Sequence, residues 1–141
     1  MSAFVTIKTE FEDPACVVEA LKELGYEPEV HEEPQALEGY HGDARAQRAE
    51  IIVRRSQIGG SSNDFGFYKD GDGKYQLWLS QFDQSFVPRK HKLQGVQGLT
   101  NKLAQSYAVH KVTKTARKER WKVKTAVQQD GSVKVKLSAW K

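Results

Sequence analysis

The fold is decided most clearly by one stretch of the chain, DFGFYKDGDGKYQLWLSQF at residues 64–82. Aromatic and aliphatic residues stand on both sides of the tetrapeptide at 70–73, which reads Asp-Gly-Asp-Gly. Asp-Gly steps supply the positive φ angles that tight hairpin turns need, so the stretch predicts two antiparallel strands and a turn. The tetrapeptide also resembles the start of a calcium loop. However, Lys74 and Gln81 stand where that loop needs oxygen ligands, and a turn is the better interpretation.

The segments before this hairpin predict a strand, a helix and further strands. Ala3–Thr9 consists largely of β-forming residues. Asp13-Pro14 is typical of a helix start and Gly25 of a helix end, which predicts a helix at residues 14–24. The other elements expected here are a strand within Glu29–Tyr40, a turn or loop at 43–49, a strand at 48–55 and a flexible surface loop at 56–63.

The C-terminal segments predict a second helix and a second hairpin. Leucine, valine and tyrosine recur at helical spacing from Leu93, and we extend this helix to about Lys118. Residues 121–127 and 133–140 then alternate between apolar residues and lysine around a turn at Asp130-Gly131. Alternation places the valines on one face and Lys122, Lys124, Lys134 and Lys136 on the other.

These elements predict a single α+β domain over residues 1–141. We expect a mainly antiparallel sheet of about six to seven strands, with two helices packed on one face. The expected core comprises Val17, Leu21, Leu24, Ile52, Phe67, Leu77, Leu99, Leu103, Val123 and Val135, with Val127, Val133 and Leu137 also buried beneath the last hairpin.

The composition bears on the cellular compartment of the protein, and it argues against a membrane-spanning or a secreted, disulfide-linked protein. With 38% hydrophobic residues the chain can bury a core, yet no apolar run is long enough to span a membrane. The N-terminus lacks the pattern of a secretory signal. Cys16 is the single cysteine, which excludes an internal disulfide. We therefore expect a cytoplasmic protein, or a stromal one if a plastid encodes it.

Charge is strongly segregated along the chain. Residues 1–70 carry 7 basic and 14 acidic residues, whereas residues 71–141 carry 15 basic and 4 acidic residues. One explanation is that the two halves attract each other within one folded domain. The other is that the basic half forms a contact surface for an acidic protein or for RNA.

No motif for catalysis, a metal or a cofactor is present, so the sequence predicts none of the three. The histidines lack the spacing of a zinc site. Cys16 falls in the first turn of the first helix, where we interpret it as a structural residue. Tyr107 and His110 share a helical face, and with Tyr40 and His41 they are the residues expected to line any pocket.

Several segments carry a family resemblance: FVTIKT at 4–9, VVEALKELGY at 17–26, AEIIVRR at 49–55, LTNKLAQSYAVHKV at 99–112 and DGSVKVKLSAW at 130–140. In this order they resemble the uncharacterised family called hypothetical chloroplast reading frame thirty-five, found in cyanobacteria, red-algal plastids and other bacteria. The loop 56–63 and the stretch 84–95 are longer here than in the family pattern. The resemblance implies no activity, but it implies an acidic, ferredoxin-like partner, because such proteins are encoded nearby.

The expected function is therefore that of a non-catalytic binding or accessory protein. Its expected surface for an acidic partner consists of Arg117, Lys118, Arg120, Trp121, Lys122, Lys124, Lys134 and Lys136. RNA is the alternative partner for the same surface, because cations bind phosphates and aromatic rings stack on bases. An enzyme with an unrecognised site is the remaining alternative. The sequence leaves the oligomeric state open.

Overall fold

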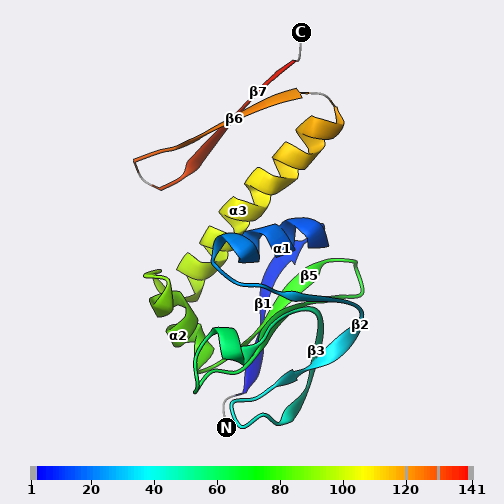
Figure 1. Cartoon of the computed structure of the whole chain (residues 1–141), viewed down its shortest axis with the longest axis vertical. Helices are drawn as coiled ribbons and strands as arrows, with labels where there is room; N and C mark the ends of the chain where they lie inside the picture. Colours follow the sequence, from blue (N-terminus) through cyan, green and yellow to red (C-terminus); the bar gives the residue numbers. More distant parts are fainter. Residues whose placement is uncertain (1–2, 120, 130, 140–141) are drawn as a thin grey trace.

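A computed structural model describes residues 3–119, 121–129 and 131–139. These residues form seven strands and three α-helices in an α+β arrangement (Figure 1). In chain order the elements are β1 (Phe4–Phe11), α1 (Pro14–Glu23), β2 (Glu29–Glu38), β3 (Ala44–Val53), a 3-10 turn η1 (Arg55–Gln57), β4 (Phe65–Lys69), β5 (Tyr75–Ser80), α2 (Asp83–Lys90), α3 (Gly95–Lys118), β6 (Trp121–Val127) and β7 (Val133–Ala139).

The strands form two antiparallel sheets rather than the single sheet that we expected. Five strands lie in the order β1-β5-β4-β3-β2, while β6 and β7 pair only with each other in a second sheet. The β6–β7 hairpin lies at the opposite end of the molecule from the first sheet, beside α3 (Figure 1). The α+β class is therefore confirmed, but the C-terminal hairpin is not part of the main sheet.

The hairpin at residues 64–82 lies at the centre of the five-stranded sheet, as β4 and β5. Its turn forms as predicted, since the Asp70 carboxylate accepts hydrogen bonds from the backbone nitrogens of Asp72 and Lys74 at 2.9 and 3.0 Å. Phe65, Phe67 and Leu77 are at most 1% exposed. Central strands with buried aromatic residues explain why this stretch carried the clearest signal.

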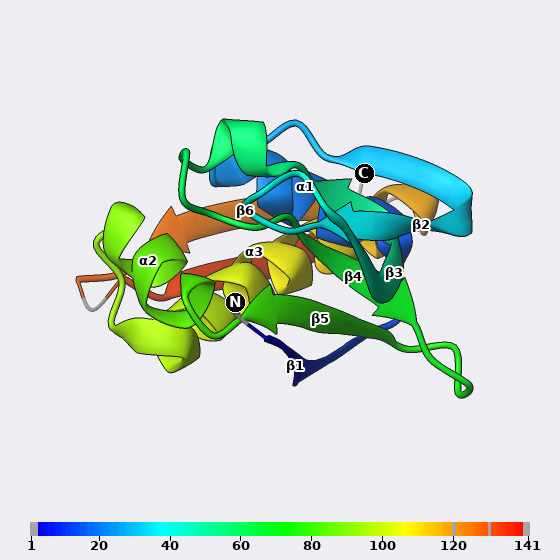
Figure 2. The ribbon, with the colours of Figure 1, turned by 90° about the horizontal axis from the view of Figure 1, so that it is seen from below.

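Helices α1 and α3 cover one face of the five-stranded sheet (Figure 2). Helix α1 forms as predicted, because the Asp13 carboxylate caps the Ala15 nitrogen at 3.0 Å and Gly25 adopts a φ of 97° at the other end. Of the expected core residues, the structure buries Val17, Leu21, Ile52, Phe67, Leu77, Leu99 and Leu103. Leu24 and Val135 are only half-buried, and the Val123 side chain lies outside the described part.

A smaller core lies on the other face of the sheet, where Leu37, Ala49 and Ile52 pack with Phe4. Gly66 makes this packing possible. A Cβ at that position would lie 2.5 Å from the Ile51 carbonyl oxygen, so only glycine allows the strands to approach so closely. None of the helices in the described residues is long and apolar enough to cross a membrane.

Two local expectations were wrong, and one helix was not expected. Strand β3 begins at Ala44, so residues 44–49 are not a turn or loop. Helix α2 was not expected, although Ser80 accepts a hydrogen bond from the Asp83 nitrogen at 3.1 Å, in the spacing of a helix-capping motif. The loop 56–63 is not a surface loop throughout, because Ser62 and Asn63 are 0% exposed.

Candidate functional site

The predicted partner surface lies on the β6–β7 hairpin and the end of α3. The backbone register places Lys124 opposite Lys136 and Ala126 opposite Lys134. Lys134, Lys136, Arg117 and Lys118 are exposed. The side chains of Trp121, Lys122 and Lys124, and the whole of Arg120, lie outside the described part. The described residues supply no carboxylate that pairs with any of these four exposed cations.

The opposite face of the hairpin is less buried than expected. Val127 is 77% exposed, and Val133 is half-buried. Leu137 cannot be compared, because its side chain lies outside the described part. Helix α3 packs beside the hairpin, and the Gln105 side chain donates to the Gly131 carbonyl at 2.9 Å. An isolated two-stranded sheet is marginally stable. The hairpin therefore depends on α3 and still presents apolar surface to solvent.

Other cations of the basic half are neutralised by the acidic half. Lys111 and Lys114 of α3 approach the Asp13 carboxylate at 3.3 and 2.7 Å. Lys74 pairs with Glu12. Burial alone would raise the pKa of Asp13, but the hydrogen bonds from the two lysines outweigh it and lower the pKa to about 2. Attraction between the halves is therefore real at these positions, but it does not extend to Lys134 and Lys136.

The four residues expected to line a pocket do not form one site. Tyr107 accepts hydrogen bonds from the backbone nitrogens of Glu12 and Asp13, both at 3.0 Å, and stacks on Phe11. His110 contacts the Glu23 carboxylate at 2.8 Å. Tyr40 and His41 pack against each other in the turn between β2 and β3. Tyr107 and His110 therefore connect α3 to α1 and to the residues just before it. Tyr40 and His41 are not part of this contact, because they lie in the turn between β2 and β3.

Cys16 is also a structural residue in the fold. It is 3% exposed, and burial raises the pKa of its thiol. Burial therefore outweighs the effect of its position in the first helical turn. Among the described residues, no group of three or more histidine, cysteine, aspartate or glutamate side chains is arranged to hold a metal ion.

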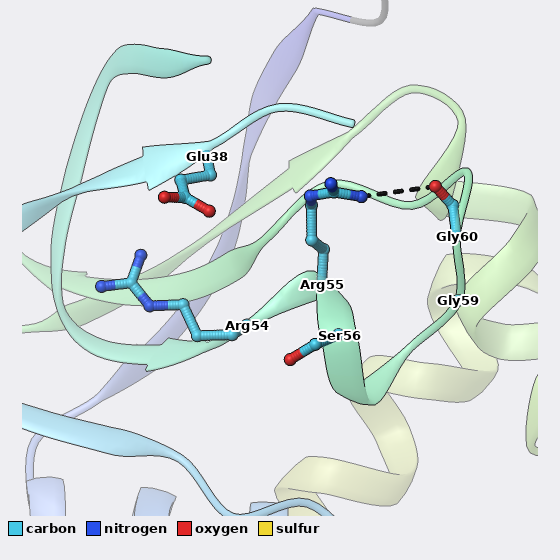
Figure 3. Close-up of a pocket in the computed structure, with 6 residues that line it drawn as sticks. All are labelled: Glu38, Arg54, Arg55, Ser56, Gly59 and Gly60. Atoms are coloured by element: carbon cyan, nitrogen blue, oxygen red, sulfur yellow. Dashed lines mark hydrogen bonds between the residues drawn. The ribbon is translucent and has the colours of Figure 1, made fainter. Parts of the chain in front are cut away.

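A cavity that the sequence did not predict lies between the end of β2 and the segment after β3. Its volume is about 450 Å³, and its lining residues are Glu38, Arg54, Arg55, Ser56, Gly59 and Gly60. Figure 3 shows Glu38 approaching from β2, while the other residues come from the end of β3 and the turn that follows. The Arg55 guanidinium donates to the Gly60 carbonyl at 3.3 Å across this turn.

Asp64 holds together the two backbone segments that flank the cavity, at Glu38 and at Arg55, which we call the cavity frame. Its carboxylate is 0% exposed, and it accepts hydrogen bonds from the backbone nitrogen of Glu38 at 2.8 Å and from that of Arg55 at 2.7 Å. It also pairs with the Arg54 guanidinium at 2.9 Å. The buried Asp64 carboxylate therefore positions the backbone of Glu38 on one side of the cavity and that of Arg55 on the other.

Arg54 is the lining residue whose charge is already paired. Besides Asp64, it binds both oxygens of Glu29 at 2.9 Å, and Glu29 in turn contacts His31 at 2.8 Å. The hydrogen bonds from Arg54 lower the pKa of Glu29 to about 2, and Glu29 raises the pKa of Arg54. Arg54 is thus neutralised by two carboxylates, which leaves Arg55 as the cavity's cation without a carboxylate partner in the described residues.

A second buried carboxylate anchors the far end of the same loop. Asp83 accepts hydrogen bonds from the Asn63 nitrogen at 3.0 Å and from the Ser80 hydroxyl at 2.8 Å. The Asn63 side chain also accepts from the Tyr40 nitrogen at 3.0 Å. The sequence signal for this arrangement is Ser-Asn-Asp at 62–64, because such short polar residues bond readily to nearby backbone groups.

The sheet, the framed cavity and the separate basic hairpin define an α+β protein with two separate candidate binding surfaces. A family model described as "Protein of unknown function (DUF1257)" matches residues 20–136. The chain therefore belongs to this family. No curated protein and no solved structure is similar enough to the chain to count as a match. The matched residues include the cavity lining as well as Lys134 and Lys136.

Proposed function

We propose that this protein is a binding or accessory protein that docks an acidic protein through its basic C-terminal surface. This surface consists of Arg117 and Lys118 at the end of α3 together with Lys134 and Lys136 on β7. The observation that carries the proposal is the contrast in charge pairing. Lys111, Lys114 and Lys74 are neutralised within the chain, whereas these four cations meet no carboxylate among the described residues.

The geometry of the hairpin supports docking of a folded partner. Lys134 and Lys136 stand two residues apart on β7, so strand alternation puts both exposed lysines on one face, where their like charges repel. A negatively charged partner would relieve the repulsion. Val127, which is 77% exposed on the opposite face, adds apolar surface to the same hairpin, and protein interfaces commonly combine apolar and charged groups.

The class of partner rests on charge and on the family resemblance. A surface of unpaired lysine and arginine favours an acidic protein. The resemblance to the hypothetical chloroplast reading frame family suggests a ferredoxin-like protein, so a purified plant-type [2Fe–2S] ferredoxin is the probe for the first test. RNA and a second copy of this chain are the rival occupants of the surface.

The test compares two double variants by biolayer interferometry with immobilised ferredoxin. Lys134→Ser with Lys136→Ser should weaken binding by about tenfold at low salt, because each removes an unpaired interfacial charge. Lys8→Ser with Lys69→Ser is the matched control, since both are exposed strand lysines of the five-stranded sheet. Raising the salt concentration should weaken wild-type binding and leave the weakened variant less affected.

Other results would contradict the proposal. Equal loss of affinity in the control pair would show that only net charge matters. Tighter binding of a single-stranded RNA oligonucleotide than of ferredoxin would favour the nucleic-acid alternative. Concentration-dependent self-association that the two lysine substitutions abolish would assign the surface to a second copy.

A further inference from the structure

The cavity between β2 and the η1 segment carries two opposite charges that are not paired with each other. Glu38 is exposed, and within the described residues no ion pair of 4.0 Å or less involves either Glu38 or Arg55. Among the described residues, the Arg55 side chain donates one hydrogen bond, to the Gly60 carbonyl at 3.3 Å, so most of its donors are not engaged by described groups. A carboxylate and a guanidinium thus face one space and remain apart.

Their separation is built into the backbone. The two oxygens of Asp64 hold the nitrogen of Glu38 and the nitrogen of Arg55, and the Asp64 nitrogen donates to the Glu38 carbonyl at 2.9 Å. These bonds join residues on different elements through a side chain that is 0% exposed. A binding site needs this kind of support, since its groups must be held by residues that are themselves fixed.

The remaining wall leaves room for a ligand. Gly60 lines the cavity, and a Cβ built there would meet no atom within 4 Å. A volume of about 450 Å³ falls within the range of small-molecule sites. Arg54 adds no unpaired charge, because Glu29 and Asp64 occupy it. The ligand that fits must therefore satisfy one cation and one anion at once.

We propose that this cavity binds a small zwitterion, whose carboxylate pairs with Arg55 and whose ammonium pairs with Glu38. Amino acids and related amino carboxylates are the chemical class. Arg55 offers paired donors that match a carboxylate, and Glu38 offers the acceptors that an ammonium needs. This site is separate from the basic hairpin and is independent of the docking function.

The test is an NMR titration of the full-length ¹⁵N-labelled protein. Glycine, β-alanine and 4-aminobutanoate are the probes, because they carry the two charges at increasing separation. Propionate and propylammonium are the single-charge controls. Ligands of this size bind at about millimolar Kd. We expect at least one zwitterion to shift the amides of Glu38, Arg55, Gly59 and Gly60 saturably, with a Kd at least about tenfold below both controls.

Variants test whether Glu38 and Arg55 are the two side chains that bind the charged groups of the zwitterion. Glu38→Gln and Arg55→Gln should each weaken the best zwitterion by about tenfold, whereas Glu33→Gln and Arg48→Gln, which change the same residue types on β2 and β3 outside the cavity, should leave it unchanged. The ¹⁵N spectra show in the same experiment that each variant is folded. Equal binding of zwitterions and single ions, shifts outside the cavity, or no saturation by any zwitterion would each overturn the proposal.

Discussion

At the scale of single residues, Asp64 is the side chain that joins the backbone segments on the two sides of the cavity. It binds the Arg54 guanidinium and two backbone nitrogens, and it is fully buried. In Asp64→Asn, the amide group would direct a donor toward Arg54 or toward one of these nitrogens. Arg54 would keep its pair with Glu29, but a buried group that loses its hydrogen-bond partner costs about 1–3 kcal/mol, and Asp64 satisfies several such groups.

We therefore expect Asp64→Asn to lower the free energy of unfolding by about 3 kcal/mol, measured by urea denaturation, because more than one of its buried hydrogen bonds is lost. Asp72→Asn is the control, because Asp72 lies in the exposed turn between β4 and β5 and should change stability by less than about 0.5 kcal/mol. Equal stability of the two variants would mean that Asp64 does not hold the frame.

The ion pair between Glu29 and Arg54 predicts a defined dependence of stability on pH. The pKa of Glu29 falls from 4.5 to about 2 in the folded protein. A lowered pKa stabilises the fold above the unfolded-state pKa, and this stabilisation is lost as the pH falls through the folded-state pKa. The loss should therefore occur between about pH 4.5 and about pH 2.

Glu29→Gln tests this directly by urea denaturation at a series of pH values. The variant should be less stable than the wild type at neutral pH, and the difference should shrink as the pH approaches about 2. Glu33→Gln, at an exposed position on the same strand, should show a difference that does not vary with pH. A constant difference for Glu29→Gln as well would refute the assigned ion pair.

Residue-scale features were the least predictable from sequence. Ser62, Asn63 and Asp64 follow two glycines and have the composition of a flexible loop. The polar groups of Asn63 and Asp64 are satisfied by Arg54, Ser80 and Asp83, which reach them only through tertiary contacts. Local composition therefore favoured a surface loop, and the long-range partners decided otherwise.

At the scale of elements, the start of α1 links the acidic and basic halves. The Asp13 carboxylate caps α1 with one oxygen and receives Lys111 and Lys114 of α3 with the other. Asp13→Ala removes both functions. We expect it to lower the free energy of unfolding by about 1–2 kcal/mol, because a lost cap costs about 1 kcal/mol and exposed ion pairs contribute less.

Asp13→Ser separates the two contributions, since serine keeps a capping oxygen but carries no charge. It should recover most of the stability that Asp13→Ala loses, when both are measured by urea denaturation. Equal loss in the two variants would assign the effect to the lysine contacts instead.

The β6–β7 hairpin should be the less stable of the two sheets. It has two strands, and its described valines are exposed or half-buried, whereas β4 and β5 are buried at the centre of five strands. We expect backbone amides of β6 and β7 to exchange with deuterium much faster than those of β4 and β5, as measured by NMR. Equal protection would contradict a separately packed hairpin.

Elements were predicted well where local signals agreed. The cap at Asp13, the turn at residues 70–73 and the helical spacing up to Lys118 all matched the structure. The sequence could not show in the same way that the last hairpin forms a sheet of its own. Alternation specifies a strand with two faces, but it does not specify which element covers the apolar face.

At the scale of the whole molecule, one part of the segregated charge is paired within the chain and another part is not. Part of it joins the halves, through Asp13 with α3 and Glu12 with Lys74. The end of α3 and the β6–β7 hairpin, which carry Arg117, Lys118, Lys134 and Lys136, lie at the end of the molecule away from the five-stranded sheet (Figure 1). The cavity lies beside β2 and β3 of the five-stranded sheet, so the two proposed sites lie at different ends of the molecule.

The docking proposal is tested most directly by mapping the contact surface on the ¹⁵N-labelled protein with unlabelled plant-type ferredoxin. We predict that shifts and line broadening concentrate at Arg117, Lys118, 125–128 and 132–136, that they saturate, and that raising the salt concentration reverses them. Changes confined to β1, β2 or the cavity, or no change at low salt, would contradict docking through the basic C-terminal surface.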